Sequence, residues 1–309
     1  MNADPFRKLV RSEGVRLYRD LPWRRTRDPY GIWLSEVMLQ QTQVVRVCDR
    51  WPVWLERFPT VGALAQAPVA DVLAAWQGMG YNRRALALHR AAMYIMERFD
   101  GEFPRDASAL CELPGVGPAT AQGIRSFAFD LPGVYLETNV RTVILHHFFP
   151  DVPAVPDKEL VGIVEATCPG PQAPEGRFAL PEDERDTPRT WYYAMLDYGA
   201  YLKKTIPNPS RRSASYSRQS AFEGSRRQKR AALVRCLLEA GEDGLNAGEA
   251  RAALDKMEAC AGRPAVAPDV AQSILEDLAR EGFCQKRSDV DRYFVAHWMC
   301  SADLPGDTC

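Results

Sequence analysis

The sequence lacks any long apolar run. Nothing in its 309 residues approaches the roughly eighteen consecutive apolar residues that a membrane-spanning helix needs. The first residues, MNADPFRKLVRSEG, include acids and have no apolar core segment, so we expect no signal peptide. These two absences predict a cytoplasmic protein with no membrane partner.

The eight cysteines show no metal-ligand pattern. None stands in a Cys-x-x-Cys pair, and no group of Cys and His residues has the spacing of a metal site. In a cytoplasmic chain they are most simply reduced thiols, buried or exposed. They are Cys48, Cys111, Cys168, Cys236, Cys260, Cys284, Cys300 and Cys309.

Net charge is also nearly absent, at −1, but this total conceals a local imbalance. Residues 201–230 contain nine Lys and Arg residues against one acid, Glu223. Such a strip is either a solvated basic face or a surface that meets phosphates.

What is present indicates a globular, helical protein of two or three packed units, since 46% of residues are hydrophobic and 26% are charged. Apolar spacing and turn residues predict one helix after another with short connections, which favours an all-α fold. The predicted N-terminal helices cover residues 5–20, 32–51, 52–58, 60–66, 69–77 and 82–98. In the helix over 32–51, Glu36, Gln40 and Gln43 fall three or four residues apart, so they are either satisfied inside the fold or line a cavity.

Residues 111–139 join a Gly-rich hairpin between two helices to a carboxylate, Glu137. Gly115 and Gly117 flank a tight turn, after which a helix starts. The first N–H groups of a helix are unpaired and carry the positive end of its dipole, so this turn is suited to bind a phosphate. The alternative is an ordinary helix C-cap with two turn glycines.

The C-terminal part changes in composition at 224–226. Before it, helices are predicted over 139–149, 158–167 and 191–204, with Asp197 as a buried cap or hydrogen-bond acceptor, and residues 205–224 look extended. After it, three helices and two short β-like runs follow the winged-helix order. Such a module binds DNA, packs or dimerises, and its third helix is acidic.

Five motifs stand in order along the chain: LPWR, SEVMLQQTQV, GMGY, LPGVGPATA and ETNVRTV. Together they resemble the helix-hairpin-helix DNA glycosylases of the endonuclease III superfamily, most closely the adenine glycosylase branch. The resemblance covers about residues 5–204. It implies an all-α, bilobal fold whose substrate is a nucleotide flipped out of double-stranded DNA containing a mispaired or damaged base. It also implies a nucleoid-associated monomer.

The resulting domain prediction places the glycosylase domain in 1–224. Lobe one covers about 23–135, and lobe two combines 1–22 with 136–224. A winged-helix-like module follows over 225–299, with a tail over 300–309. The module is too short and too helical to match the oxoguanine-recognising domain of full-length adenine glycosylases.

Removal of a base needs an acid that protonates the leaving base and an anion that stabilises a cationic sugar. Glu36, on an apolar helix where desolvation raises its pKa, is the natural acid. Glu137 is the natural anion. The family normally has Asp in an Asp-Gly-Asn-Val pattern there, and the extra methylene of Glu137 shifts the carboxylate. Asn139 matches a residue beside that carboxylate.

Further roles follow from the resemblance alone. Trp23, Arg24 and Gln41 are expected to line the base pocket, with Tyr193 at the position where adenine glycosylases have Gln or Glu. Tyr81 matches the residue that wedges into the base stack. The expected DNA contacts are Gln40, Tyr81, Gly115, Val116, Gly117, Lys203, Lys204, Arg211 and Arg212.

In most relatives, the helix that corresponds to residues 191–204 ends in a Gly-Ala pair followed by four cysteines, and these cysteines hold an iron–sulfur cluster. Here Gly199-Ala200 leads into residues 201–230 without a cysteine, so no cluster is expected. A monovalent or divalent cation at the hairpin is compatible with the sequence. We expect the basic strip over 203–230 to take the DNA-binding role of the cluster loop.

These features predict a monofunctional DNA glycosylase, with adenine opposite guanine or oxoguanine as the favoured target. One alternative is removal of another base, such as uracil or thymine mispaired with guanine. Another is a non-catalytic DNA-binding protein that senses lesions.

The residue two positions after Gly117 tests the reaction type. Bifunctional relatives have a Lys there that attacks the sugar, whereas this chain has Ala119, which cannot form a Schiff base. We expect borohydride to trap no covalent protein–DNA complex during base removal. A trapped complex on a denaturing gel would contradict this prediction.

Overall fold

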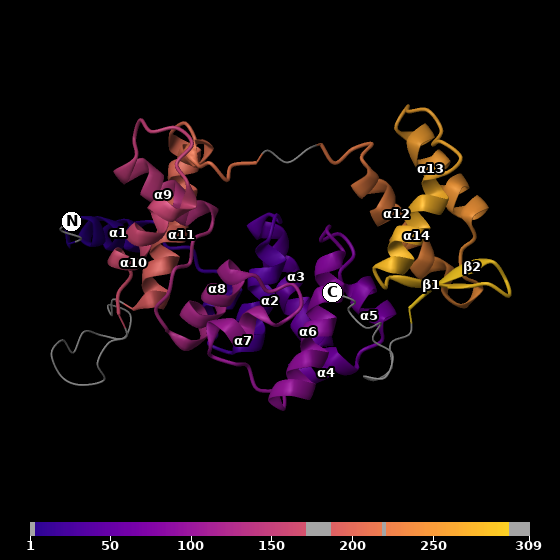
Figure 1. The fold of residues 1–309 in the computed structure, drawn as a ribbon, viewed down its shortest axis with the longest axis horizontal. Helices are drawn as coiled ribbons and strands as arrows, with labels where there is room; N and C mark the ends of the chain where they lie inside the picture. Colours follow the sequence, from indigo (N-terminus) through magenta and orange to yellow (C-terminus); the bar gives the residue numbers. More distant parts are fainter. Residues whose placement is uncertain (1–3, 171–186, 218–220, 297–309) are drawn as a thin grey trace. The chain divides into compact units, whose positions relative to one another are not determined.

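A computed structural model describes residues 4–170, 187–217 and 221–296. By its internal contacts the chain divides into two units, residues 1–40 with 103–218 and residues 41–102 with 219–309 (Figure 1). The first unit contains α1 (Asp4–Arg16), η1 (Pro22–Arg25), α2 (Pro29–Leu39), α7 (Ala107–Cys111), α8 (Pro118–Phe129), α9 (Thr138–Phe148), α10 (Asp157–Thr167), α11 (Pro188–Thr205) and η3 (Pro209–Arg212).

The second unit combines two separate stretches of chain. Its elements are α3 (Val44–Arg57), α4 (Val61–Gln66), α5 (Val69–Ala75), α6 (Arg83–Phe99), α12 (Arg226–Ala240), η4 (Gly241–Asp243), α13 (Ala247–Cys260), α14 (Val270–Arg280), β1 (Cys284–Arg287) and β2 (Arg292–Val295). The expected all-α class is confirmed. The domain boundaries that we derived from the sequence stay a prediction, and the expected tail over 300–309 lies outside the described residues.

Helices α9 and α11 form the centre of the first unit's core. Val143, Ile144 and Met195 are fully buried between them, and Val10 of α1 packs into the same cluster. The two helices approach so closely that a Cβ at Gly199 would lie 2.2 Å from the carbonyl oxygen of Asn139. Gly199 therefore allows α11 to pack against the N-terminal turn of α9.

The single helix predicted over 32–51 is wrong. It is interrupted between Leu39 and Val44, and Gln41 adopts a left-handed conformation with φ of +54°. Gln43 therefore does not continue the polar stripe of Glu36 and Gln40. The helix predicted over 52–58 is also wrong, because α3 runs through Pro52 to Arg57. Apolar spacing continues across both points, so periodicity alone did not locate the break.

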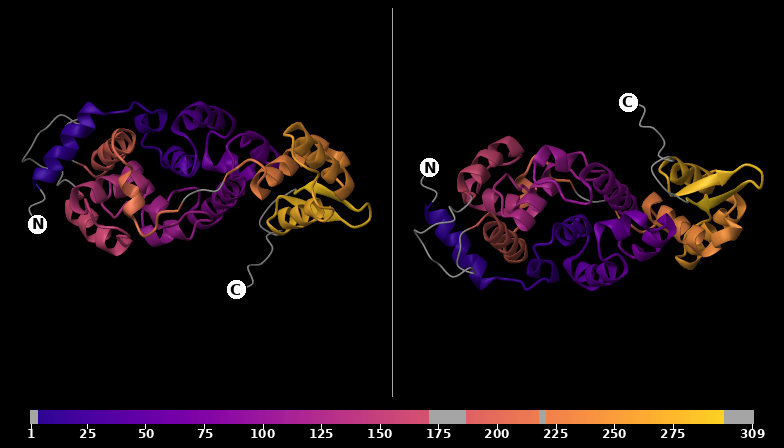
Figure 2. Two further views of the ribbon diagram at one scale, coloured as in Figure 1. Left: turned by 90° about the horizontal axis from the view of Figure 1, so that it is seen from above. Right: turned by 90° about the horizontal axis from the view of Figure 1, so that it is seen from below.

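The C-terminal stretch confirms the winged-helix order of three helices and a hairpin. Strands β1 and β2 pair antiparallel, from Cys284 opposite Val295 to Arg287 opposite Arg292. Leu245 forms a further antiparallel bridge to Tyr293. Figure 2 shows the hairpin beside α12, α13 and α14. The predicted N-cap Asn246 is also confirmed, since its side chain accepts from the N–H of Glu249 in a capping box.

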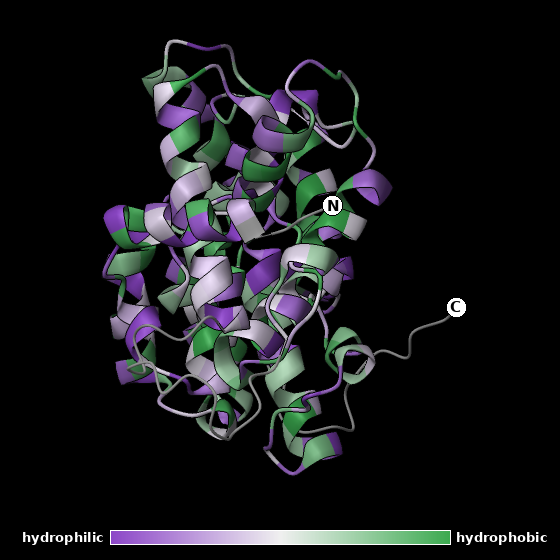
Figure 3. Ribbon diagram, turned by 90° about the vertical axis from the view of Figure 1, so that its left-hand side faces the viewer, coloured by the Kyte–Doolittle hydropathy of each residue, from purple (hydrophilic) through white to green (hydrophobic). Residues whose placement is uncertain are grey.

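Hydrophobic and hydrophilic residues alternate along the individual helices (Figure 3), as expected for helices that bury one face. Among the described helices, none is both long enough and apolar enough to span a membrane.

Candidate active site

The Gly-rich hairpin joins α7 to α8 in the first unit. Gly115 has φ of +77°, a backbone conformation that residues with a side chain rarely adopt, and Gly117 is the N-cap residue of α8. The N–H of Val116 donates to the carbonyl of Leu113 at 3.0 Å, so this predicted phosphate donor is already engaged. Among the described residues, the N–H groups of Gly115 and Gly117 have no backbone acceptor. The turn therefore offers two donors, rather than three, beside the positive end of α8.

Glu36 lies on α2, which packs against α8. Its Oε2 accepts a hydrogen bond from the hydroxyl of Tyr135, with an O···O distance of 3.0 Å. One turn further along α2, the Gln40 side chain donates to the Thr120 hydroxyl at 3.2 Å and so links the end of α2 to α8. The sequence analysis did not identify Tyr135. It lies two residues before Glu137 in an extended segment, where alternate residues share a side, and that spacing was the available signal.

Burial raises the pKa of Glu36 to about 8, the Tyr135 hydrogen bond lowers it, and the charge of Glu137 raises it further. Glu36 therefore retains a proton at neutral pH. Desolvation also raises the pKa of Tyr135, so its hydroxyl is likewise protonated. The resulting pair contains a neutral carboxylic acid held by a neutral phenol.

Gly123 of α8 provides the space for this carboxyl group. A Cβ at this position would lie 2.2 Å from Oε2 of Glu36 and 3.0 Å from the Tyr135 ring. The position of Glu36 thus depends on the absence of a side chain on the facing helix. Gly123 was not among the predicted site residues, because a glycine within a helical pattern does not reveal which side chain it accommodates.

Glu137 is the N-cap residue of α9. Its Oε1 accepts from the N–H groups of Asn139, at 2.5 Å, and Val140, at 3.0 Å. The Asn139 amide donates to Oε2 at 3.3 Å, while the buried Oδ1 of Asn139 has no partner among the described residues. The longer side chain that distinguishes this chain from the family pattern is therefore folded back onto the helix end.

The surroundings of Glu137 differ from those of Glu36. Burial raises the pKa of Glu137, but the charge of Lys203 on α11 and the hydrogen bonds from Val140 and Asn139 oppose that shift. Burial correspondingly lowers the pKa of Lys203, and Glu137 raises it. A helix N-terminus, three N–H donors and a nearby cation stabilise the ionised form of Glu137, whereas Glu36 has a single phenol.

Arg24 of η1 is held by Asp197 of α11 in a buried, bidentate ion pair, with N···O distances of 2.7 and 2.9 Å. Asp197 is therefore a buried acceptor, as predicted. The Arg24 guanidinium lies 4.3 Å from the ring centroid of Tyr193, and Phe127 stacks on Tyr193 with a centroid distance of 4.4 Å. Trp23, the neighbour of Arg24, is buried.

Tyr193 has a buried hydroxyl with no partner among the described residues. Burial raises its pKa, against the opposing effect of the Arg189 and Arg24 charges. The phenol is therefore protonated and able both to donate and to accept a hydrogen bond. Of the predicted base-pocket residues, Arg24 is paired with Asp197, while the Tyr193 hydroxyl has no hydrogen-bond partner among the described residues.

Gln41 and Tyr81 lie in the second unit. Both are exposed and both have positive φ, of +54° and +48°, although neither is glycine. Such conformations are costly for residues with side chains and are frequent at functional sites.

The predicted basic strip is not a single surface. Lys204 and Arg211 are exposed, but Arg212 folds back and donates to the Leu145 carbonyl at 2.9 Å near the C-terminal end of α9. Three other cations are paired with acids of later helices: Arg226 with Asp277, Lys229 with Glu258 and Arg230 with Glu281. Charges counted along the sequence missed these carboxylates, which lie more than twenty residues away. Arg218 lies outside the described residues.

The segment after α11 does not fit an iron–sulfur cluster. Residues 205–224 contain no cysteine. Within the described parts of the chain, no group of three or more His, Cys, Asp or Glu residues is placed to hold a metal ion. Instead, η3 and the backbone pairing of Val155 with Arg212 and Ala214 anchor the segment.

A family model described as "HhH-GPD superfamily base excision DNA repair protein" matches residues 34–161. The chain is 37% identical over 232 residues to the adenine DNA glycosylase of Mycobacterium tuberculosis, a match covering 71% of this chain and 74% of that protein. It is 42% identical over 167 residues to the adenine DNA glycosylase of Mycolicibacterium smegmatis, covering 53% of this chain and 57% of that protein. The chain thus spans a little over half of that relative.

Among solved structures, the fold is similar to that of a thermostable thymine-DNA glycosylase. The TM-score is 0.55 at 21% identity, and the match covers 67% of this chain and 90% of that chain. At this identity the similarity concerns the fold.

The contact at Gly123 generates a prediction. In Gly123→Ala, the new methyl displaces the flexible end of Glu36, and misplacement of about 1 Å costs about a hundredfold in rate. Stability also falls, by about 1 to 3 kcal/mol, because the methyl overpacks a contact that includes the buried Tyr135 ring. Single-turnover base removal and thermal unfolding measure the two effects.

Gly162→Ala is the matched control, since Gly162 is also helical and a Cβ there meets nothing within 4 Å. Loss of rate in both variants, or in neither, would contradict the role assigned to Gly123.

Proposed function

Since the chain belongs to the HhH-GPD superfamily of base excision DNA repair proteins, we propose that it hydrolyses the N-glycosidic bond of adenine mispaired in double-stranded DNA. Guanine or oxoguanine is the proposed opposite base. The carrying observation is the pair of carboxyl groups in the first unit with different surroundings: burial raises the pKa of Glu36 to about 8, whereas Lys203 and the N–H groups of α9 oppose the effect of burial on the pKa of Glu137.

The two groups divide the reaction between them. Glu36 donates its proton to a ring nitrogen of the flipped-out base, so that the base leaves as a neutral molecule. Glu137 stabilises the positive charge that develops on the sugar; water then adds to the anomeric carbon and gives up a proton, which returns Glu36 to its acid form. Tyr135 holds the Glu36 carboxyl in place between transfers.

The proposed reaction is monofunctional and leaves an intact abasic site. Ala119 at the exposed start of α8 supports this, because it has no amine that attacks the sugar. The absence of cysteine from residues 205–224 supports a protein that works without an iron–sulfur cluster, and we propose that it acts on DNA as a monomer.

The choice of adenine rests on the relatives. Tyr193 replaces the amide or carboxylate of the family, and its phenol can pair with adenine or with another base. Removal of a different base is therefore the second candidate. A protein that only binds DNA is disfavoured, since burying a carboxyl group beside a phenol costs stability that binding alone does not require.

A single-turnover panel distinguishes the candidates. Duplexes carry A·oxoG, A·G, U·G, T·G or hypoxanthine·T, and alkali cuts the abasic sites formed. We expect cutting at adenine, and Glu36→Gln to slow it by about a thousandfold while duplex affinity is retained. Cutting only at uracil or thymine would move the assignment to the second candidate, and tight binding without cutting would reject catalysis.

The rate should also depend on pH in a defined direction. Glu36 acts when protonated, so with a pKa of about 8 its active fraction is high at pH 6 to 7, is halved near pH 8, and falls tenfold per pH unit above it. Glu137 acts when ionised and limits the rate on the acid side. Single-turnover rates across this range measure both limbs, and a rate that stays constant to pH 9.5 would exclude Glu36 as the acid.

A further inference from the structure

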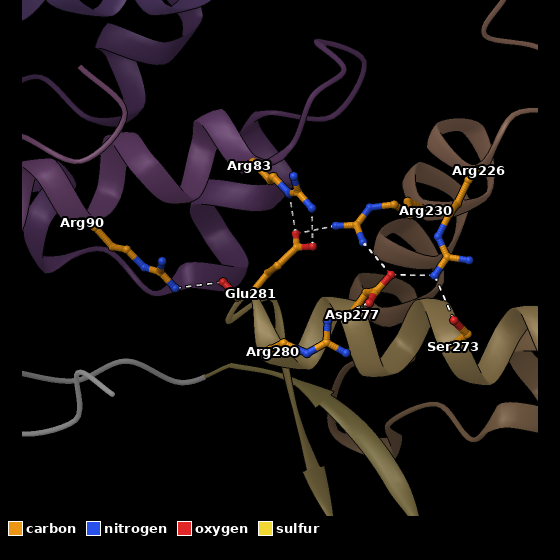
Figure 4. Close-up of polar contacts among 8 residues, drawn as sticks. All are labelled: Arg83, Arg90, Arg226, Arg230, Ser273, Asp277, Arg280 and Glu281. Carbon is orange, nitrogen blue, oxygen red and sulfur yellow. Dashed lines mark hydrogen bonds and ion pairs between the residues drawn. The ribbon is translucent and has the colours of Figure 1, made fainter. Parts of the chain in front are cut away.

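Within the second unit, the C-terminal end of α14 is bound by arginines from two helices (Figure 4). The Glu281 carboxylate accepts from Nε of Arg83 on α6, at 2.7 Å, and pairs with Arg230 of α12. Arg90, two turns further along α6, donates to the Glu281 backbone carbonyl at 2.9 Å. We call these four residues the Glu281 cluster.

The Glu281 cluster joins the winged-helix-like module to α6. Cations at the C-terminal end of a helix are stabilised by its dipole, and Arg83 meets the carboxylate through two nitrogens, a geometry with directional strength. The acidic helix of the module is therefore occupied within the protein. This observation argues against insertion of that end of α14 into a DNA groove.

Helix α12 is joined to the end of α14 through Arg230 and Glu281. Four of its first five residues are cations, and its first turn contains no acid. Cations are disfavoured at this end of a helix, so the arrangement needs compensation. Arg226, Lys229 and Arg230 have carboxylate partners in α13 and α14. The fourth cation, Arg227, points to Tyr81: it donates to the Tyr81 hydroxyl, and its guanidinium lies 5.5 Å from the ring centroid.

Tyr81 immediately precedes Asn82, the N-cap residue of α6, in a strained turn. Its φ of +48° follows positive φ values at Gly78 and Gly80. Arg84 stabilises the turn by donating to the carbonyls of Met79, at 2.9 Å, and Gly80, at 3.0 Å, and its guanidinium lies 5.6 Å from the Tyr81 ring. The exposed ring thus contacts guanidinium groups from both α6 and α12.

We propose that Arg227, placed by the Glu281 cluster, is a positioning residue for Tyr81 and holds its ring in the orientation that enters the DNA base stack. This inference rests on the proposed function, in which Tyr81 is the wedge. A side chain fixed before binding loses less conformational entropy when it inserts, so the contact contributes to the bound state without touching the reacting atoms. The module then acts on DNA through Tyr81.

The test follows wedge insertion by fluorescence. The probe is a duplex with 2-aminopurine next to a mispaired adenine, whose fluorescence rises when the stack opens. Wild type should give a rise that Tyr81→Ala abolishes. Arg227→Ala and Glu281→Gln should each weaken the insertion equilibrium by about threefold to tenfold, the range expected for loss of a cation–π contact. Arg235→Ala, an exposed position on the same helix, is the control and should match wild type.

A double variant separates positioning from a simple phosphate contact. If Arg227 acts through Tyr81, the duplex affinity of Tyr81→Ala with Arg227→Ala is no weaker than that of Tyr81→Ala alone, whereas an independent contact would multiply the losses of affinity. Tyr81→Phe, which keeps the ring and removes the hydroxyl acceptor, should show a loss smaller than that of Tyr81→Ala. Thermal unfolding in parallel identifies any variant that fails to fold.

Three results would overturn the inference: wild-type fluorescence in Arg227→Ala, multiplicative losses in the double variant, or no Tyr81-dependent rise in wild type. Failure of this inference can be told apart from failure of the proposed function, because insertion and base removal are measured separately. Insertion that depends on Tyr81 and Arg227, without base removal from any duplex, would support the inference and reject the chemistry. Base removal that depends on Glu36 with normal insertion in Arg227→Ala would do the reverse.

Discussion

The contact between α2 and α8 determines what the candidate site can do. Because the two helices pack closely at Gly123, Glu36 is partly buried and accepts a hydrogen bond from the Tyr135 hydroxyl, and burial raises its pKa to about 8. Glu137 receives N–H groups and the field of Lys203 instead. The different surroundings of these two chemically identical side chains therefore come from helix packing.

The second constraint on this unit is the buried ion pair between Arg24 and Asp197. The bidentate pair of Arg24 with Asp197 joins η1 to α11. Tyr193 of α11 lies against the Arg24 guanidinium, and the N-terminal turn of α9 packs against Gly199 of α11. A buried pair of this kind contributes little net stability, but removal of one partner leaves an uncompensated charge, which costs about 3 to 5 kcal/mol. Its role is better described as holding Arg24 beside the Tyr193 ring.

The sequence predicted the fold class, most helices, the winged-helix order and the buried acceptor Asp197, because these follow from apolar spacing and turn residues. It did not predict the break at Gln41, since a left-handed residue leaves no trace in hydrophobic periodicity. Tyr135 and Gly123 were missed because their roles arise from contacts across helices. The DNA-binding role of the basic strip stays a prediction, and the sequence did not show that Arg226 and Arg230 pair with the distant acids Asp277 and Glu281.

The cap formed by Glu137 has an evolutionary consequence. A side-chain acceptor at a helix N-cap is worth about 1 kcal/mol, so selection for stability alone would retain a carboxylate at this position. Glu36 has the opposite balance, since its burial is a cost that only a reaction offsets. In a lineage that no longer needed the reaction, Glu36 would drift first and Glu137 would persist. Under the proposed function, Glu36, more than Glu137, therefore records whether a descendant of this chain keeps the activity.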